Sequence, residues 1–147
     1  MLDTQKSRIW KYVATDTGFS GIREYLNPDT LPDLSLSTGF VIDGSVWSGT
    51  SNGRILRFTQ GKENTYVSQG VDPVFGTRLY VYTSDSVINV YVLDINNHRV
   101  VVLDKDGMYL AQYRFTGVTT PTKLVVSESA KKILLLADGK IYALDLK

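Results

Sequence analysis

Hydrophobic and polar residues alternate along most of this chain with the two-residue period of β-strands, and turn-forming residues interrupt the pattern at short intervals. The clearest example is the stretch 89–115, in which residues 90–93 and 99–103 are apolar and β-branched and a polar turn separates them. Asp106 and Gly107 then supply a tight hairpin, because glycine reaches positive φ without steric penalty. This stretch predicts three consecutive antiparallel strands.

The pattern recurs along the chain. Four strand-like segments open on a basic residue and then place large apolar residues at their third and fifth positions, so that the same face is apolar each time. The four basic residues lie 46, 45 and 41 residues apart: Arg8, Arg54, Arg99 and Lys140. A period of this length, built from four antiparallel strands, is typical of the blades of a β-propeller.

We therefore expect one all-β domain over residues 1–147, a β-propeller of about three to four four-stranded blades per chain. The blades are predicted at about 1–26, 39–68, 79–115 and 123–147. In the second blade the expected strands are 39–42, 45–49, 54–59 and 65–68, and in the third 79–82, 90–93, 99–103 and 109–115. The first blade keeps only strands at 8–14 and 22–26 and a remnant at 1–3. The last has 123–126, 133–137 and 140–144 and lacks an outermost strand.

The incomplete first and last blades raise the question of closure, because an open arc leaves strand edges unpaired. Three solutions stay open. In the first, the strand at 22–26 completes the last blade. In the second, two chains assemble into a larger ring of which each is half. In the third, the chain is part of a longer propeller. The edge problem favours assembly or truncation over a self-contained monomer. We accordingly expect self-association, as a homodimer through the open blade edges.

Residues 90–107 resemble the NHL repeat, since a strand ending in Asp94 is followed by an Asn-Asn-His-Arg turn, a second strand and an Asp-Gly hairpin. The match is good in this blade alone. The chain is also similar to uncharacterised bacterial propeller domains that follow a membrane segment in larger proteins. The NHL resemblance implies a ring scaffold, most often for binding protein or nucleic acid. In some members metals and histidines at the central channel catalyse lyase or hydrolase chemistry.

Composition narrows the possible partners. The 147 residues are 43% hydrophobic, which is enough for one core, and a net charge of +1 gives no reason to expect nucleic acid or an anionic membrane as partner. The absence of cysteine fits both a reducing cytosol and a cysteine-poor bacterial envelope, so the compartment stays open. No run approaches the roughly 20 apolar residues of a membrane span. We expect the chain as given to be soluble, with any membrane anchor lying outside it.

Candidate chemistry is sparse. His98 is the only histidine, which argues against multi-histidine metal sites and serine triads within one chain. Asp104 to Gly107 begins like a calcium loop but lacks its later acidic ligands, so we expect a hairpin turn. Nucleotide-binding loops, nucleophile elbows and zinc-protease motifs are absent from the sequence. We expect no catalytic residue, no metal, no cofactor and no enzymatic activity.

Candidate contact residues come from turns and loops. The long proline-rich loop at 26–33 is the first choice for a loop that contacts a partner, and the loop at 71–76 is the second. The basic residues that open strands are expected mainly to pair with nearby carboxylates or carbonyls. The candidate binding residues are Asn27, Asp29, Asp33, Phe75, Asn97, His98, Arg54 and Arg99. We expect a non-enzymatic scaffold for protein or peptide binding or for self-assembly. The alternative is a ligand-binding or enzymatic site at the axis of a closed dimeric propeller, where two copies of His98 would meet.

Overall fold

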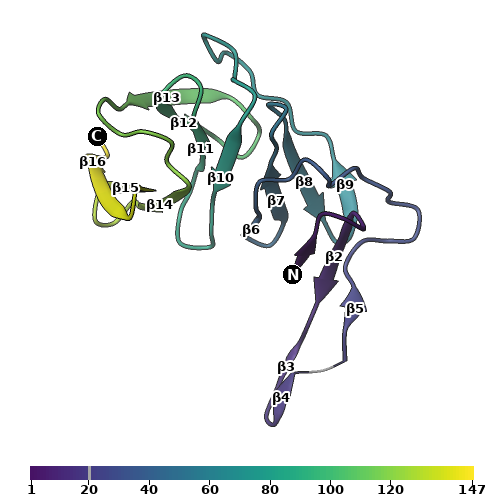
Figure 1. Ribbon diagram of the computed structural model, residues 1–147. Coiled ribbons are helices and arrows are strands. Elements are labelled where there is room, and N and C mark those ends of the chain that lie inside the picture. Colours follow the sequence, from purple (N-terminus) through teal and green to yellow (C-terminus); the bar gives the residue numbers. More distant parts are fainter. Residues whose placement is uncertain (20) are drawn as a thin grey trace.

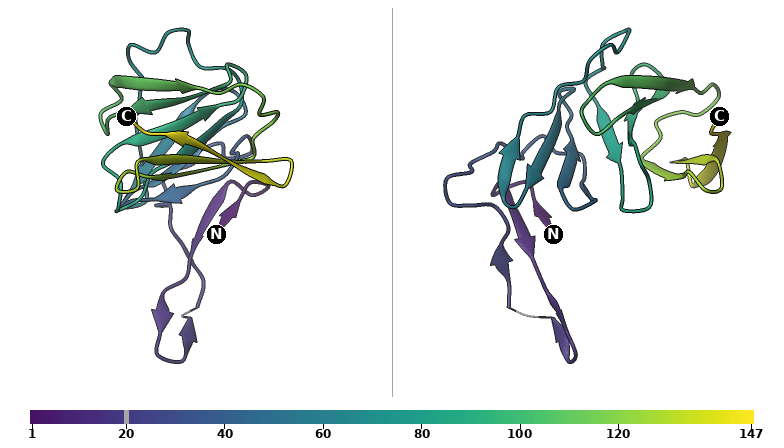
Figure 2. Two further views of the ribbon diagram at one scale, coloured as in Figure 1. Left: turned by 90° about the vertical axis from the view of Figure 1, so that its left-hand side faces the viewer. Right: turned by 180° about the vertical axis from the view of Figure 1, so that it is seen from behind.

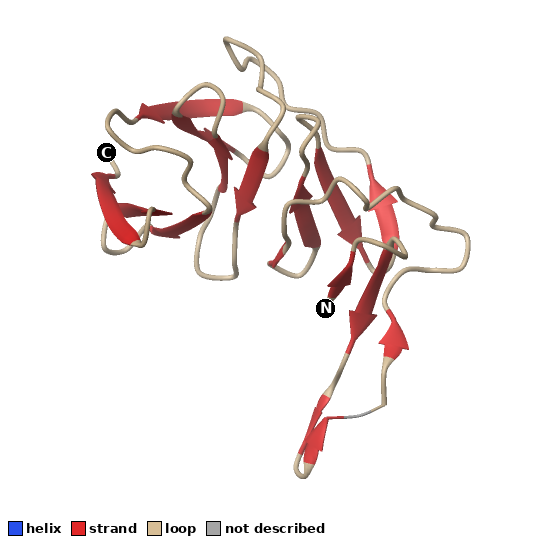
Figure 3. Ribbon diagram, in the orientation of Figure 1, coloured by secondary structure: helices blue, strands red, loops and turns tan. Residues whose placement is uncertain are grey.

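The computed structural model of the protein describes residues 1–19 and 21–147 and shows only strands, turns and loops in them. The strands form separate antiparallel sheets arranged side by side in an open arc (Figures 1 and 3). This confirms the predicted all-β class. Nowhere in these residues is there a helix long and apolar enough to cross a membrane.

The second blade has four strands in the order β6 (Val41–Ile42), β7 (Val46–Gly49), β8 (Ile55–Thr59) and β9 (Lys62–Asn64). The prediction of its outermost strand at 65–68 is wrong. Gln60 and Gly61 both adopt positive φ, 51° and 79°, which makes a two-residue hairpin and brings the chain back at once. Gln60 is not among the residues that usually form such a turn, so the turn was not predictable from the sequence.

The third blade is the most regular. Its strands are β10 (Leu79–Tyr82), β11 (Val90–Asp94), β12 (Arg99–Leu103) and β13 (Tyr109–Arg114), paired in that order. All residues of β11 and β12 are buried, as expected for the two central strands of a sheet that is covered on both faces. The predicted four-strand pattern of this blade is therefore confirmed.

The first blade contains β1 (Leu2–Asp3), β2 (Arg8–Lys11) and β5 (Arg23–Glu24). Between β2 and β5 a small hairpin of β3 (Ala14–Thr15) and β4 (Gly18–Phe19), which the sequence did not predict, projects away from the arc (Figure 2).

The last blade contains β14 (Lys123–Ser127), β15 (Lys132–Ala137) and β16 (Lys140–Asp145). Strand β5 pairs with β2 and not with β16, so closure of the last blade by residues 22–26 does not occur in this structure. The first and last blades lie at opposite ends of the arc (Figure 1).

Apolar side chains between neighbouring blades form the core. One cluster, with Phe58 and Ile9, lies between the first and second blades. Another, with Trp47 and Leu103, lies between the second and third, and the last, with Leu93 and Ile133, lies between the third and last. Burying each such side chain stabilises the fold by about 1.5–3 kcal/mol. The blades are thus held together by their faces and not by strand pairing.

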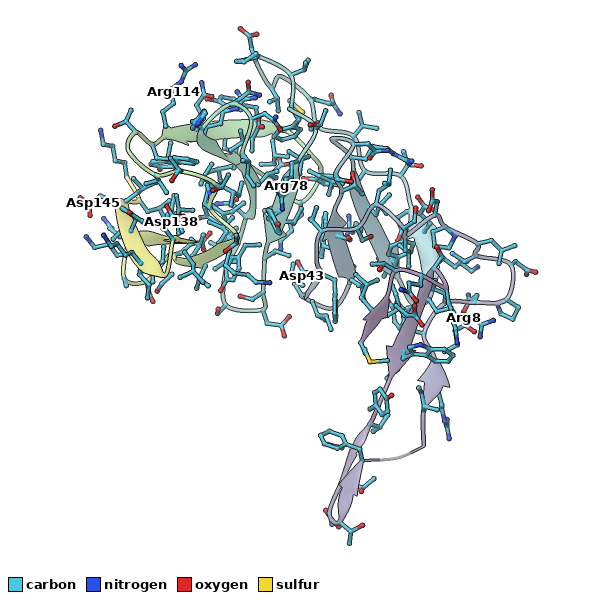
Figure 4. The ribbon with its side chains drawn as sticks, in the orientation of Figure 1. Arg8, Asp43, Arg78, Arg114, Asp138 and Asp145 are labelled. Atoms are coloured by element: carbon cyan, nitrogen blue, oxygen red, sulfur yellow. The ribbon has the colours of Figure 1, made fainter. Side chains whose placement is uncertain are left out.

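A polar junction also links the second blade to the third. Asp43 follows directly after β6 (Figure 4). Its carboxylate accepts hydrogen bonds from Trp47 Nε1 and Thr83 Oγ1 and forms an ion pair with Lys105. Burial tends to raise the pKa of Asp43, but the hydrogen bonds from Lys105 and Trp47 outweigh it and hold the pKa below its usual value. The junction therefore stabilises this pair of blades while Asp43 is ionised.

Candidate functional site

The basic residues that open strands do not form one uniform ring. Arg99 is completely buried and its guanidinium contacts Asp94. It also donates hydrogen bonds to the carbonyl oxygens of Asp72, Pro73 and Val74, which lie in the loop between β9 and β10. Arg99 therefore holds this loop in place and is not accessible to a ligand, in agreement with the structural role expected for most of these residues.

Arg8 and Arg54 are exposed, but their surroundings differ. Arg8 pairs with Glu24 at 3.4 Å on the outside of the first blade (Figure 4). The Arg54 guanidinium makes no hydrogen bond or ion pair with any residue that the structure describes. Asp33 is close enough for Arg54 to lower its pKa slightly, although hydrogen bonds from Ser35 lower that pKa more. Arg54 is thus the predicted basic residue with a free side chain beside a pocket.

That pocket has a volume of about 310 Å³ and lies where the second blade loses its outer strand. Beyond Asn64 the chain leaves β8 and crosses to the third blade, where Gln69 hydrogen-bonds to Gly107 and Tyr109. Two predicted candidates, Arg54 and Phe75, meet here. Further lining residues are Gly53, Ile55, Glu63, Asn64, Thr65, Tyr66, Val67 and Ser68.

The loop at 26–33 borders a second pocket of about 710 Å³. Asn27 lines it together with Lys6 and Leu31, whose side chain is 89% exposed. Asp29 and Asp33 are exposed and do not line it. Of these three candidate residues, Asn27 thus lines the pocket and the two aspartates do not.

Asn97 and His98 lie in the turn between β11 and β12. Asn97 Nδ2 donates hydrogen bonds to Asp94 Oδ2 and to the carbonyl oxygen of Val74, at 2.7 and 3.2 Å. His98 adopts a left-handed conformation with φ of 49°, and its exposed ring packs edge-on against Phe115. Both residues stabilise the turn. In residues 1–19 and 21–147 there is no group of three or more His, Asp or Glu side chains that could hold a metal ion.

The outer face of the last blade, which we define as Val125, Leu134, Leu136 and Ile141, was missed by the sequence analysis. Val125 is 48% exposed and Ile141 is 72% exposed. A shallow pocket of about 250 Å³ lies among these side chains. The sequence contains a signal for this face in the uninterrupted apolar run Ile133 to Ala137. A strand with one exposed face alternates polar and apolar residues, so an uninterrupted apolar strand indicates that both of its faces are covered.

The outer face of the first blade is different in character. It carries Asp3, Arg8, Trp10 and Glu24, which share one side of β1, β2 and β5 by their register, while Ile9 on the other side is buried against the second blade. The Arg8 guanidinium lies 5.5 Å from the centroid of the Trp10 ring. One end of the arc is therefore largely polar, whereas the other has four apolar side chains with Lys123, Lys132 and Asp145 at their margins.

Comparison with known proteins supports the architecture. No family model and no curated protein matches the sequence. Among solved structures, the chain is similar to PorZ, a surface component of the type-IX secretion system of Porphyromonas gingivalis, with a TM-score of 0.53 and 9% identity over 94% of this chain and 17% of PorZ.

Two further solved structures are similar to the chain at TM-scores of 0.49. They are BamB from Moraxella catarrhalis, at 20% identity over 96% of this chain and 40% of BamB, and virginiamycin B lyase from Staphylococcus aureus, at 17% identity over 98% and 50%. The chain thus spans half or less of the length of each protein. The blades and the likeness to PorZ together show an all-β, propeller-type fold.

Proposed function

We propose that this protein is a non-enzymatic β-propeller scaffold that works by self-association, through the outer face of its last blade. The observation that carries the proposal is that β14–β16 carries apolar side chains on both sides, although the register also places Lys123, Lys132 and Asp145 on the outer side. Leu124, Ile133 and Leu135 are buried against the third blade, while Val125 and Ile141 face away from it. A sheet with two apolar faces is typical of an interior layer, and an exposed apolar patch marks a protein interface.

The chemistry of the two ends of the arc favours a particular arrangement of two copies. Head-to-tail stacking would place Asp3, Arg8 and Glu24 of one copy against apolar side chains of the other and would desolvate charges without new partners. A two-fold arrangement instead packs the apolar side chains Val125, Leu134, Leu136 and Ile141 of the two copies against each other. Lys123 and the Lys132–Asp145 ion pair lie on the same face, at its margins. The edge of β16 that faces away from β15 pairs with no strand of residues 1–19 and 21–147, so it adds unpaired backbone groups at the same place.

A substitution on this face tests the proposal. Ile141→Glu places a charge in the centre of the interface, and Val74→Glu, at a loop residue that is 79% exposed and far from the last blade in sequence, is the matched control. We expect light scattering on a sizing column to give dimers for the wild type and for Val74→Glu, and monomers for Ile141→Glu. A wild type that is monomeric at every concentration, or an Ile141→Glu variant that dimerises as well as the wild type, would overturn the proposal.

A further inference from the structure

The second blade has an outer strand that covers only half of its neighbour. Strand β9 pairs with β8 at Arg57, Phe58 and Thr59 and then ends. In the third blade the equivalent strand, β13, accompanies β12 along its whole length, from Arg99 to Leu103. The first part of β8 therefore presents an edge to which no strand of the described residues is paired, and the pocket of about 310 Å³ lies along this edge.

The backbone groups at this edge point into the pocket. Alternate residues of an antiparallel strand direct their N–H and C=O to opposite neighbours. Arg54 is turned toward β7, because its carbonyl oxygen accepts a hydrogen bond from the Thr50 N–H at 3.0 Å. Ile55 is consequently turned to the other side, where β9 is missing, and no described residue outside the β7–β8 ladder makes a hydrogen bond with its main chain.

The side chains around the edge differ on its two sides. Ile55, Tyr66 and Phe75 pack on the side of the third blade and make an apolar wall. The side chain of Arg54 is directed to the opposite side by the alternation of the strand, as is Glu63, which pairs with Phe58 further along. A strand laid along β8 would therefore meet an apolar surface with one residue and a free guanidinium with the next.

We propose that this edge binds a short extended peptide by strand addition. The peptide places an apolar side chain opposite Ile55 and, at the neighbouring position, a carboxylate opposite Arg54. Glu63 disfavours a second carboxylate closer to β9, so the site selects a single acidic residue next to an apolar one and not an acidic run. The pocket volume lies at the lower end of the range of about 300–1,000 Å³ that is usual for ligand sites. The site is separate from the last blade and does not depend on self-association.

Hydrogen exchange of the free protein tests the premise. We expect the Ile55 amide to exchange much faster than the amides of Leu56 and Phe58, which are turned toward β7. Equal protection of the Ile55 and Leu56 amides would overturn the proposal, because the edge would then already be occupied.

The binding test uses a displayed library of random heptapeptides, selected against the Ile141→Glu variant so that the last blade contributes no binding. We expect enriched peptides to contain an Asp or Glu beside a β-branched or aromatic residue. Arg54→Gln should weaken their binding about two- to fivefold. Ile55→Pro removes the outward N–H without breaking the β7 ladder and should weaken binding about tenfold, while Ile55→Val should not. Failure to enrich any peptide, or binding that is indifferent to both Arg54→Gln and Ile55→Pro, would overturn the proposal.

Discussion

Arg99 and Asp94 form an ion pair that is closed to solvent. Nε and Nη2 of the guanidinium both lie 3.0 Å from Oδ2 of the carboxylate, and neither side chain has any exposed surface. Arg99 also donates hydrogen bonds to three carbonyl oxygens of the loop between the second and third blades. Arg99, one of the four basic residues at equivalent positions of the repeat, thus holds a loop in place from inside the fold.

The first prediction concerns this pair. Arg99→Met leaves the Asp94 carboxylate buried without a counter-charge, so we expect a loss of about 3–5 kcal/mol in the free energy of unfolding. Arg8→Met, which breaks the exposed pair with Glu24, should cost only about 0–1 kcal/mol. Urea denaturation of the two variants checks the difference. Equal losses would show that the buried pair does not stabilise the fold in the way described.

The second prediction concerns acid stability. The folded protein holds the pKa of Asp43 below its unfolded value, so the carboxylate binds fewer protons when folded. Its contribution is complete above the unfolded pKa of about 3.9 and is lost as pH falls through the lower folded pKa. We expect the stability of the wild type to fall more steeply below about pH 4 than that of Asp43→Asn. Unfolding free energies measured from neutral to acidic pH decide this, and parallel curves would contradict it.

The third prediction concerns the junction of the third and last blades. The Glu128 carboxylate accepts hydrogen bonds from the Ile88 N–H and the Tyr91 hydroxyl, both at 2.8 Å. Burial of Tyr91 and, to a smaller extent, this contact raise the pKa of its hydroxyl. We expect Tyr91→Phe to cost about 1–3 kcal/mol, because the partly buried carboxylate loses a donor. Tyr12→Phe, at an exposed residue, is the control. Thermal unfolding of both variants gives the comparison.

The fourth prediction concerns the contact of the second and third blades. A methyl group on Gly49 would lie 2.5 Å from the carbonyl oxygen of Leu79, whereas one on Gly39 would meet nothing within 4 Å. Neither glycine has a φ in the left-handed region, so the two substitutions differ in space and not in backbone strain. We expect Gly49→Ala to cost about 1–3 kcal/mol and Gly39→Ala to cost much less. Similar unfolding midpoints for the two variants would contradict the close packing of these blades.

The repeat of apolar strands was sufficient to predict the blades, because blade strands are short, regular and separated by turns. Residues 79–115 show this best, where each of the four predicted strands overlaps an observed one. The short β9 was missed because Gln60 supplies a turn conformation that is usual for Asn or Asp. The hairpin of β3 and β4 was missed because its strands have only two residues each and no apolar period.

The candidate sites were less predictable, since they depend on which segments meet in space. Arg54 and Phe75 were both singled out, but their convergence on one pocket follows from the end of β9, which the sequence did not reveal. The sequence analysis gave Arg99 and Arg54 the same role, although Arg99 is fully buried and Arg54 is exposed. The complete burial of Arg99 depends on the loop that covers it, and the sequence of a single repeat does not determine where that loop lies.

Cysteine cross-linking tests the central claim, self-association through the last blade, most directly, because the native chain contains no cysteine. Single cysteines placed in turn at Val125, Leu136 and Ile141 lie on the proposed two-fold interface, and one at Val74 is the control. We predict that mild oxidation converts at least one of the three variants into a covalent dimer, while the Val74→Cys protein stays monomeric under denaturing conditions. If none of the three forms more covalent dimer than Val74→Cys, the outer face of the last blade does not join two copies of this chain.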